Sequence, residues 1–361
     1  MKPRNYQKQA SRTRRLNWEN SDGPNIVILG VIGELGSLAS VLKKHFRDDQ
    51  AYANYRKDFI EEVGDILWYV TSTATHIGMD LEEWPSAKQE ITTSSECLYG
   101  LYKKVSSLLE IRDQLRFPKD HDHSATKDLI LDIYSDLQTL AHFIDSNLEE
   151  IADLNCNKIL SYWCMNESLP ARQFDINFPE YEQLPRKFCV DFVSINDHTS
   201  ILIMLNGFAI GDRLTDNAHS DDGYRFHDVF HLAGIATLGW SPVFRRMLKR
   251  KRKSVPKVDE VEDGARAAII EEAIINHIYD YARPNFLEGM SRVDLDLINR
   301  IQDLVQGYEV SECEPWEWQD CILKSYELFR EIKEKKSGRI SIDCEKRLIE
   351  LNPLPEEYCH N

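Results

Sequence analysis

The chain has 361 residues, of which 42% are hydrophobic and 29% are charged, and its formal net charge is −16. This length suits two or three domains, and the composition is that of a globular protein with sizeable cores. Because an acidic surface repels nucleic-acid backbones, the charge argues against a general nucleic-acid coat protein, and nucleic acid is an unlikely partner.

The cysteines and the first residues indicate the compartment. The eight cysteines are scattered and form no C-x-x-C pair, which argues against a zinc ribbon. The start, MKPRNYQKQASRTRR, is basic without an apolar stretch behind it, so we expect no secretory signal. The most apolar run, Ile26–Leu42, contains Glu34 and several glycines, and it is too short and too polar in pattern for a membrane span. We therefore expect a soluble, cytoplasmic protein in a reducing compartment, with no membrane partner.

The N-terminal part, residues 1–168, is predicted to be an all-α bundle. Apolar residues recur there at intervals of three and four, as on one face of a helix. The polar stretch Arg47–Asn54 separates the first two helices, and the run PKDHDHSAT separates a later pair. The expected helices are Ile26–Leu42, Phe59–Val70, Glu96–Leu115, Thr126–Ser146 and Leu148–Trp163.

A weak internal echo runs through this part. FIEEVGDILWYV is followed by GMDLEEW, and later LILDIYSDLQTLAHF is followed by SNLEEIA. We interpret the echo as a degenerate tandem duplication of a two-helix unit. The alternative is that amphipathic helices resemble one another without common descent.

The composition changes after Pro170, and residues 169–186 suit a linker. Two strand-like runs follow, Lys187–Ile195 and Ser200–Ile210, separated by the turn-like residues 196–198. Helical patterns then resume, and the chain closes with the strand-like run GRISIDCEKRLIEL. The expected helices are Tyr224–Leu238, Pro242–Lys253, Ala265–Ala282, Arg292–Val305 and Trp316–Lys335. Residues 187–361 are thus predicted to form one α+β, mostly helical domain, and the whole chain is mainly α.

Acidic residues stand at matching places in the first two predicted helices. Glu34 and Ser37 lie three apart in one helix, and Glu62 and Asp65 lie three apart in the next. Residues three apart share a helix face, so antiparallel packing would let the three acids converge. Such a cluster inside an apolar bundle is costly unless a cation neutralises it, and Mg²⁺ prefers oxygen ligands. The alternative is a pair of solvated helix faces.

Glycines accompany these acids. Gly33, Gly36 and Gly64 each cost about 1 kcal/mol of helix propensity relative to alanine. We therefore expect the two helix backbones to approach each other closely there.

The runs NYQKQASRTRR, LGVIGELGSLASVLKK and FIEEVGDILWYV resemble the MazG-like, all-α nucleotide pyrophosphohydrolases, a superfamily that includes the dimeric dUTPases. The family pattern is E-x-x-E on one helix and E-x-x-D on the next, and these four acids bind Mg²⁺, or Mn²⁺, which holds the triphosphate. The matching positions are Glu34, Glu62 and Asp65. The second Glu of the first pair falls on Ser37, which departs from the pattern, and Glu61 could replace it only by bending in from about 100° round the helix.

The resemblance also implies substrate-binding residues. SNLEEIADLNCNKILSYW resembles the closing helix of these domains, where an Asn and a Lys reach the nucleotide, and Asn155 and Lys158 match them. Trp68 lies beside the metal face and could line a base pocket, although core packing is an equally good explanation. We add Ser37 and Lys43 to the expected substrate-binding residues.

The chemistry implied by the resemblance is hydrolysis of a nucleoside or deoxynucleoside triphosphate to monophosphate and pyrophosphate. The ion would lower the pKa of the attacking water, and Glu34 or Glu62 would position or deprotonate that water. The alternative is a catalytically weak module that binds nucleotide and is coupled to a C-terminal metal-dependent hydrolase or sensor. Such units commonly dimerise, so we expect a homo-oligomer, although the duplication could complete the bundle within one chain.

Two histidines stand out in the C-terminal half, for which no family is recognised. His227 and His231 lie four apart, hence on one helix face at a spacing that suits a divalent metal, and Glu272 could complete the site. The alternative is two hydrogen-bonded histidines at a domain surface.

The run RRMLKRKRK, residues 245–253, has seven basic residues in nine. It predicts either a phosphate-binding patch or a solvated helix paired with the acidic residues 259–263.

Overall fold

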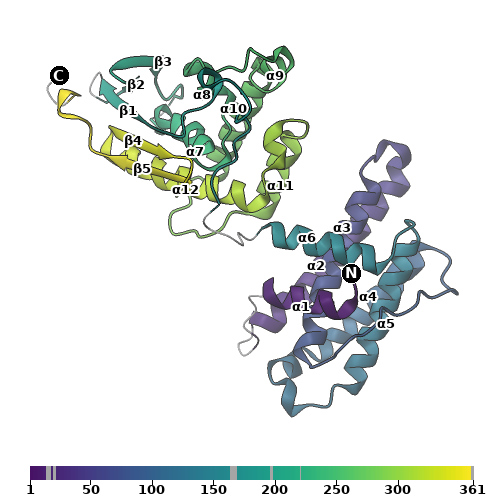
Figure 1. Ribbon diagram of the computed structural model, residues 1–361. Coiled ribbons are helices and arrows are strands. Elements are labelled where there is room, and N and C mark those ends of the chain that lie inside the picture. Colours follow the sequence, from purple (N-terminus) through teal and green to yellow (C-terminus); the bar gives the residue numbers. More distant parts are fainter. Residues whose placement is uncertain (14–17, 19–21, 163–168, 196–197, 220, 359–361) are drawn as a thin grey trace. The chain divides into compact units, whose positions relative to one another are not determined.

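The computed structural model describes residues 1–13, 18, 22–162, 169–195, 198–219 and 221–358 (Figure 1). It divides into two compact units, Met1–Leu160 and Ser161–Asn361, which are described separately. Unit 1 is all-α in its described residues, and unit 2 combines helices with one antiparallel sheet. The predicted class, mainly α with a C-terminal α+β part, is confirmed.

Unit 1 is built around two helix pairs. Helices α2 and α3 pack along each other, and α4 packs against α5 (Figure 1). A short N-terminal helix, which was not predicted, covers α3, and the chain returns through α6. The bounds are α1 Pro3–Thr13, α2 Asp22–Asp48, α3 Tyr55–His76, α4 Ser94–Glu110, α5 Ser124–His142 and α6 Leu148–Ser161. The expected end of the last helix, Trp163, lies outside the described residues.

Apolar residues at helical spacing form the core of unit 1. Leu35 and Leu38 of α2 are completely buried, as are Val63, Ile66 and Leu67 of α3. This spacing places each side chain on the face that meets the neighbouring helix. Glu62 and Asp65 interrupt the same stretch of α3, so they stand at the margin of the core.

Helix α2 is longer than expected. The segment Gly23–Ala51 is long and apolar enough, by length and composition only, to cross a membrane, so the expectation that it is too short was wrong. In the structure, its buried leucines pack against α3 in the bundle. The core helix of a globular bundle has a similar apolar composition, and 39% of the most apolar window of this helix is buried in the structure.

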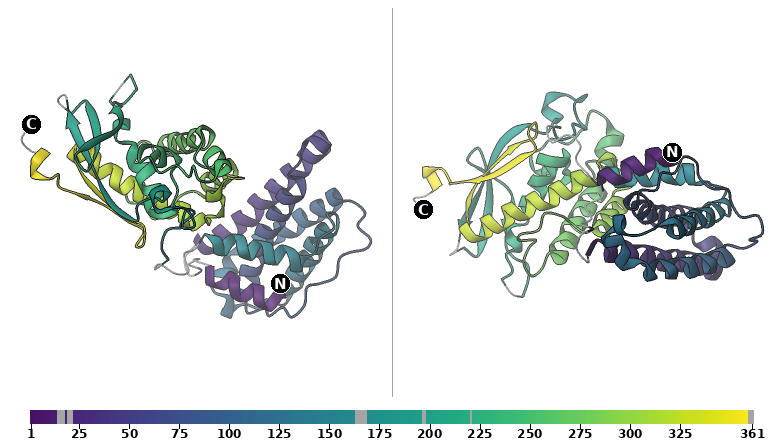
Figure 2. Two further views of the ribbon diagram at one scale, coloured as in Figure 1. Left: turned by 45° about the horizontal axis from the view of Figure 1, so that its top comes forward. Right: turned by 90° about the horizontal axis from the view of Figure 1, so that it is seen from below.

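Unit 2 contains a five-stranded antiparallel sheet of order β3-β2-β1-β4-β5. The register pairs Val190 of β1 with Ile340 of β4, and Phe192 with Ile203 of β2. These four side chains are buried on the face that the helices cover (Figure 2). The strands are β1 Lys187–Ile195, β2 Ser200–Leu205, β3 Phe208–Leu214, β4 Gly338–Asp343 and β5 Leu348–Asn352.

Two predicted single strands are hairpins. The run Ser200–Ile210 turns at Asn206 and Gly207, whose φ angles are 50° and 80°, and continues as β3. Asn-Gly favours this tight turn because both positions need positive φ. The closing run also folds back, between β4 and β5. In the turn expected at residues 196–198, between the first two strand-like runs, Asn196 and Asp197 lie outside the described residues.

Helix α7 is the central helix of unit 2. All its residues, Asp228–Leu238, are buried, and it packs against both α12 and the β4–β5 hairpin (Figure 1). Its expected first turn, Tyr224–Phe226, is a 3-10 turn. The expected helix to Lys253 ends at Met247. The other helices are α8 Pro242–Met247, α9 Pro256–Val261, α10 Ala265–Tyr281, α11 Leu295–Leu304 and α12 Pro315–Lys335.

Candidate functional site

The predicted acids of unit 1 meet where α2 and α3 pack. The carboxyl groups of Glu34 and Glu62 are hydrogen-bonded to each other, and Asp65 lies close enough to raise the pKa of both. Each of the three side chains is partly buried. The helix faces inferred from the three-residue spacing therefore do turn toward each other.

Shared burial and like charge make these groups reluctant to ionise together. Burial, followed by the neighbouring Glu34, raises the pKa of Glu62 to about 8. Burial also raises the pKa of Glu34, with Asp65 contributing. Two carboxyl groups that share a proton in this way lose their mutual repulsion when a cation replaces the proton. A nearby positive charge would therefore stabilise the ionised form of these acids.

Helix α6 holds Asp65 in place. Asn155 Nδ2 donates to Asp65 Oδ1 at 2.8 Å, and Lys158 Nζ donates to Asp65 Oδ2 at 2.6 Å. Tyr6 of α1 in turn donates to Asn155 Oδ1 at 2.6 Å. Asn155 and Lys158, which the resemblance assigned to the nucleotide, are therefore in contact with the acid cluster. Burial raises the pKa of Asp65, and Lys158 and Asn155 oppose that rise.

Glu61 belongs to the same cluster, although the sequence placed it on a different helix face. Lys158 Nζ lies 2.8 Å from Glu61 Oε1, so this lysine bridges Glu61 and Asp65. The lysine extends from another helix, which is why spacing within α3 could not reveal the contact. Among the described residues, the cluster thus sets the four acids Glu34, Glu61, Glu62 and Asp65 against one lysine.

The second helix pair offers a direct comparison. Asp132 and Asp136 of α5 face Lys88 and Lys104: Lys88 lies 2.6 Å from Asp136, and Lys104 lies 3.0 Å from Asp132. The crossed pairs are in contact as well. Two acids and two lysines are balanced, so this pair needs no further cation. The α2–α3 cluster differs, because its four acids outnumber the one lysine found with them among the described residues.

The glycines were partly misjudged. A Cβ on Gly64 would lie 3.0 Å from the Asn155 side chain, so the close approach there is real, although its partner is α6. At Gly33 and Gly36, a Cβ would meet nothing within 4 Å, and the expectation was wrong for both. The close approach of α2 and α3 occurs instead at Gly30, where the Tyr69 ring fills the space of a Cβ.

The remaining predicted substrate residues lie at different distances from the acids. Ser37 follows Glu34 by one turn and is partly buried. Trp68 packs edge-on against Tyr69, with ring centroids 5.0 Å apart, and its buried Nε1 has no hydrogen-bond partner among the described residues. Lys43 is exposed nine positions after Glu34, about 13 Å further along the helix, so it does not join the cluster.

A recess of about 960 Å³ lies elsewhere on unit 1, between the N-terminus, residues 82–91 and the end of α5. It is lined by Trp84, Lys88 and His142 among others, and by none of the four acids. Its aromatic and basic lining could receive part of a ligand, but the acid cluster rather than this recess holds the groups suited to a metal ion.

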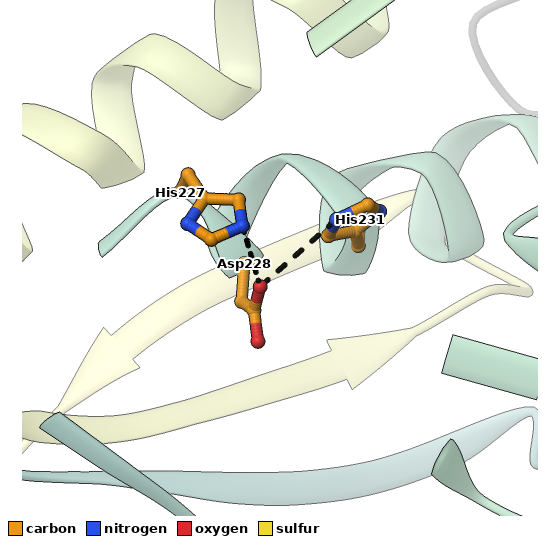
Figure 3. A group of neighbouring side chains, drawn as sticks. All are labelled: His227, Asp228 and His231. Atoms are coloured by element: carbon orange, nitrogen blue, oxygen red, sulfur yellow. Dashed lines mark ion pairs between the residues drawn. The ribbon is translucent and has the colours of Figure 1, made fainter. Parts of the chain in front are cut away.

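The histidines of unit 2 also come together (Figure 3). His227 and His231 lie with Asp228 in one group, and the ligand atoms of the three residues are within 4.8 Å of one another. Glu272 approaches from α10, its Oε1 3.4 Å from His231 Nε2. The sequence had proposed the two histidines and Glu272. Asp228, which directly follows His227 in the sequence, was not among the expected ligands, and the structure adds it to the group.

The basic run is largely structural. Arg252 is buried and pairs with Asp263 and Glu309, each at 2.7 Å, and Arg245 Nη2 donates to Asp175 at 2.8 Å. Lys251 lies 2.7 Å from Asp259. The acidic residues that follow the run therefore neutralise part of it. For these three side chains, the expectation of a phosphate-binding patch was wrong.

Comparison with known proteins locates a family relationship in unit 2. The family model described as the MazG C-terminal domain matches residues 169–355, so the expectation that this half belongs to no recognised family was wrong. The chain is also 33% identical over 61 residues to the Gene 37 protein of Mycobacterium phage L5. That match covers 16% of this chain and about half, 54%, of the relative. No solved structure matches.

The first prediction concerns the buried arginine. Arg252→Ala removes the closer of the two arginine partners of Asp263 and leaves only Arg245, whose Nε lies 3.5 Å away, and breaking a buried pair costs on the order of 3–5 kcal/mol. The free energy of unfolding of unit 2, measured by urea denaturation, should fall accordingly. The exposed neighbour provides the control, and Lys253→Ala should change it by less than about 0.5 kcal/mol. Equal effects of the two substitutions would contradict the structural role.

The second prediction concerns stability and pH. Because the pKa of Glu62 is raised in the folded state, folding favours its protonated form, and metal-free protein should lose stability as pH rises from 4.5 to about 8. Glu62→Gln removes that loss. In EDTA, its melting temperature should exceed that of the wild type above pH 8 and match it near pH 4.5. Asp128→Asn, at an exposed position on α5, is the control. A pH-independent difference would contradict the shared burial of the acids.

Proposed function

The chain belongs to the MazG C-terminal domain family, and on that premise we propose that unit 1 is the catalytic partner of this domain: a Mg²⁺-dependent nucleoside triphosphate pyrophosphohydrolase. One observation carries the proposal. Four acids gather between α2 and α3 against a single lysine among the described residues, and three of them, Glu34, Glu62 and Asp65, stand at the positions where the MazG-like resemblance places metal ligands.

The donor set suits Mg²⁺ or Mn²⁺. Mg²⁺ binds through one or two carboxylates, retains water and shares phosphate oxygens with the substrate. Glu34 and Glu62 offer adjacent carboxylates, and Asp65 is held beside them by Asn155 and Lys158. Ser37 supplies a neutral hydroxyl one turn from Glu34. The pKa of Glu62 is raised because burial and the neighbouring acids disfavour its charged form. A bound divalent ion would favour the charged form and so oppose that rise.

When bound, the ion supplies charge neutralisation of the phosphates and acidifies a water. The residues of the chain perform the remaining steps. Once a cation has displaced the proton that Glu62 shares with Glu34, the Glu62 carboxylate would accept the proton of the attacking water. The oxygen of that water bonds to one of the two phosphorus atoms joined by the α–β bridge. The bond between that phosphorus and the bridging oxygen breaks, and monophosphate and pyrophosphate leave.

Lys158 is suited to hold the negatively charged substrate. Its pKa is raised: burial opposes the charge, but Asp65 and Glu61 more than offset burial, so the ammonium stays protonated. Once an ion neutralises Asp65, Lys158 can also donate to a phosphate oxygen. We propose the partly buried Trp68, whose Nε1 has no hydrogen-bond partner among the described residues, as the aromatic side chain that contacts the base.

A second candidate function is favoured by Ser37 and by the Lys158 bridge. A site that lacks the fourth acid of the family pattern, and whose Glu61 and Asp65 are bridged by an internal lysine, is also what a nucleotide-binding module with weak turnover would contain. In that case the chain would bind nucleotide in unit 1 and act through unit 2.

We also propose a homo-oligomer, since MazG-like units commonly dimerise. The α2–α3 and α4–α5 pairs pack within one chain, with the Tyr134 hydroxyl on α5 donating to Thr71 Oγ1 on α3 at 3.0 Å, and could complete the bundle alone. Sedimentation analysis separates these outcomes.

The third prediction is the activity itself. Pyrophosphate release from a panel of nucleoside and deoxynucleoside triphosphates should require Mg²⁺ or Mn²⁺ and should fall on the order of 10²-fold or more in Glu62→Gln, because the general base is lost. The control Asp128→Asn should keep wild-type rates. Tight nucleotide binding without release in the wild type would favour the binding module, and neither binding nor release would overturn both functions.

A further inference from the structure

A second group of potential metal ligands lies at the start of α7 in unit 2. We propose that His227, Asp228, His231 and Glu272 bind one divalent transition-metal ion, of which Zn²⁺ is the best fit. This site is independent of the acid cluster in unit 1. Figure 3 shows the members from the residue that precedes α7 and from the first turn of α7. Glu272 joins them from the middle of α10.

The spacing of the donor atoms fits one ion. His227 Nε2 lies 3.2 Å from Asp228 Oδ1, and His231 Nε2 lies 3.9 Å from the same oxygen. Glu272 Oε1 lies 3.4 Å from His231 Nε2. Zinc–ligand bonds of about 2.1 Å place the donors of a tetrahedral ion roughly 3.4 Å apart. These three separations lie near that value, and the ligand atoms of His227, Asp228 and His231 are all within 4.8 Å of one another. Glu272 lies outside that group of three and would complete the shell by moving closer.

Both imidazole rings are oriented by contacts on their other nitrogen. His227 Nδ1 lies 2.9 Å from the Tyr224 carbonyl oxygen, and His231 Nδ1 lies 2.7 Å from Glu271 Oε1. Glu271 is itself fixed, because its Oε2 accepts the Val243 N–H at 2.9 Å. Carboxylate or carbonyl support of this kind places the proton on Nδ1 and leaves the Nε2 lone pair for a metal.

That arrangement of ring protons is electrostatically unfavourable. With both Nδ1 atoms donating, the Nε2 lone pairs point at the Asp228 carboxylate, so acceptor faces acceptor in a buried place. His231 and Asp228 are 1% and 4% exposed, so water offers little relief. A bound cation removes the conflict. The competing explanation is that both rings are doubly protonated and the group is a closed ion-pair network.

The choice of metal follows from the ligand types. Two imidazoles with two carboxylates form a borderline donor set, which favours Zn²⁺ over the all-oxygen sites of Mg²⁺. Three of the ligands are rigid, since every residue of α7 is buried and His227 stacks on Tyr224 at 4.4 Å. Glu272 is the exception, its side chain 44% exposed, so it is the ligand on the solvent side.

Metal binding by the full-length chain tests this proposal. Protein stripped with EDTA is loaded with ZnCl₂ and, separately, with Co²⁺, in the Glu62→Gln background to remove binding at the acid cluster. We expect one equivalent of tightly held Zn²⁺, a rise in melting temperature and the visible absorption of tetrahedral Co²⁺. His227→Gln should abolish the spectrum, and Glu272→Gln should weaken Zn²⁺ affinity on the order of 10–100-fold.

The controls keep the test decisive if buried variants misfold. Glu272 is half-exposed, so Glu272→Gln should fold even if His231→Ala does not. His219→Ala, at an exposed histidine of the same unit, should retain the full zinc content. A wild-type chain that takes up no Zn²⁺, or variants at Glu272 and His227 that bind it as the wild type does, would overturn the site in favour of protonated histidines. Loss of the site would leave the pyrophosphate-release assay of unit 1 unaffected.

Discussion

The structure of unit 1 depends on how the negative charge between α2 and α3 is compensated. Apolar spacing drives the two helices together, and the same packing brings Glu34 against Glu62. Helix α6 contributes one lysine, Lys158, and the side-chain amide of Asn155, which accepts a hydrogen bond from Tyr6. Those contacts fix Asp65 but leave the Glu34–Glu62 pair dependent on a proton. A bundle selected for stability alone would place a lysine there, as α4 and α5 do.

Other buried charges in the described residues are paired with groups of opposite charge. Arg252 has two carboxylate partners, and Asp136 has two lysines. Unpaired buried charge is expensive, so a protein tolerates it where a ligand completes the pairing. Two places among the described residues stand out by this criterion: the acids of α2 and α3, and the Asp228 group with its inward-facing imidazole nitrogens. Both carry the ligand types of a metal site.

Much of this arrangement can be predicted from the sequence. Periodicity located the helices, and three-residue spacing correctly turned Glu62 and Asp65 to one side. What it could not supply were contacts between elements far apart in the chain. Lys158 brings Glu61 into the cluster from 97 positions away in sequence, and Tyr6 acts through Asn155. Local signals were also missed, since Asn206-Gly207 marks a hairpin turn. The buried ion pairs of the basic run likewise need a tertiary fold, because charge counting cannot tell Arg252 from Lys253.

The central claim is that a divalent cation belongs between α2 and α3. Anomalous diffraction from crystals grown with Mn²⁺ and a non-hydrolysable nucleoside triphosphate tests it most directly. We expect an anomalous peak coordinated by Glu34 and Glu62, with Asp65 alongside and phosphate oxygens completing the shell. A nucleotide bound elsewhere, with Glu34 and Glu62 still sharing a proton and no peak beside them, would contradict it.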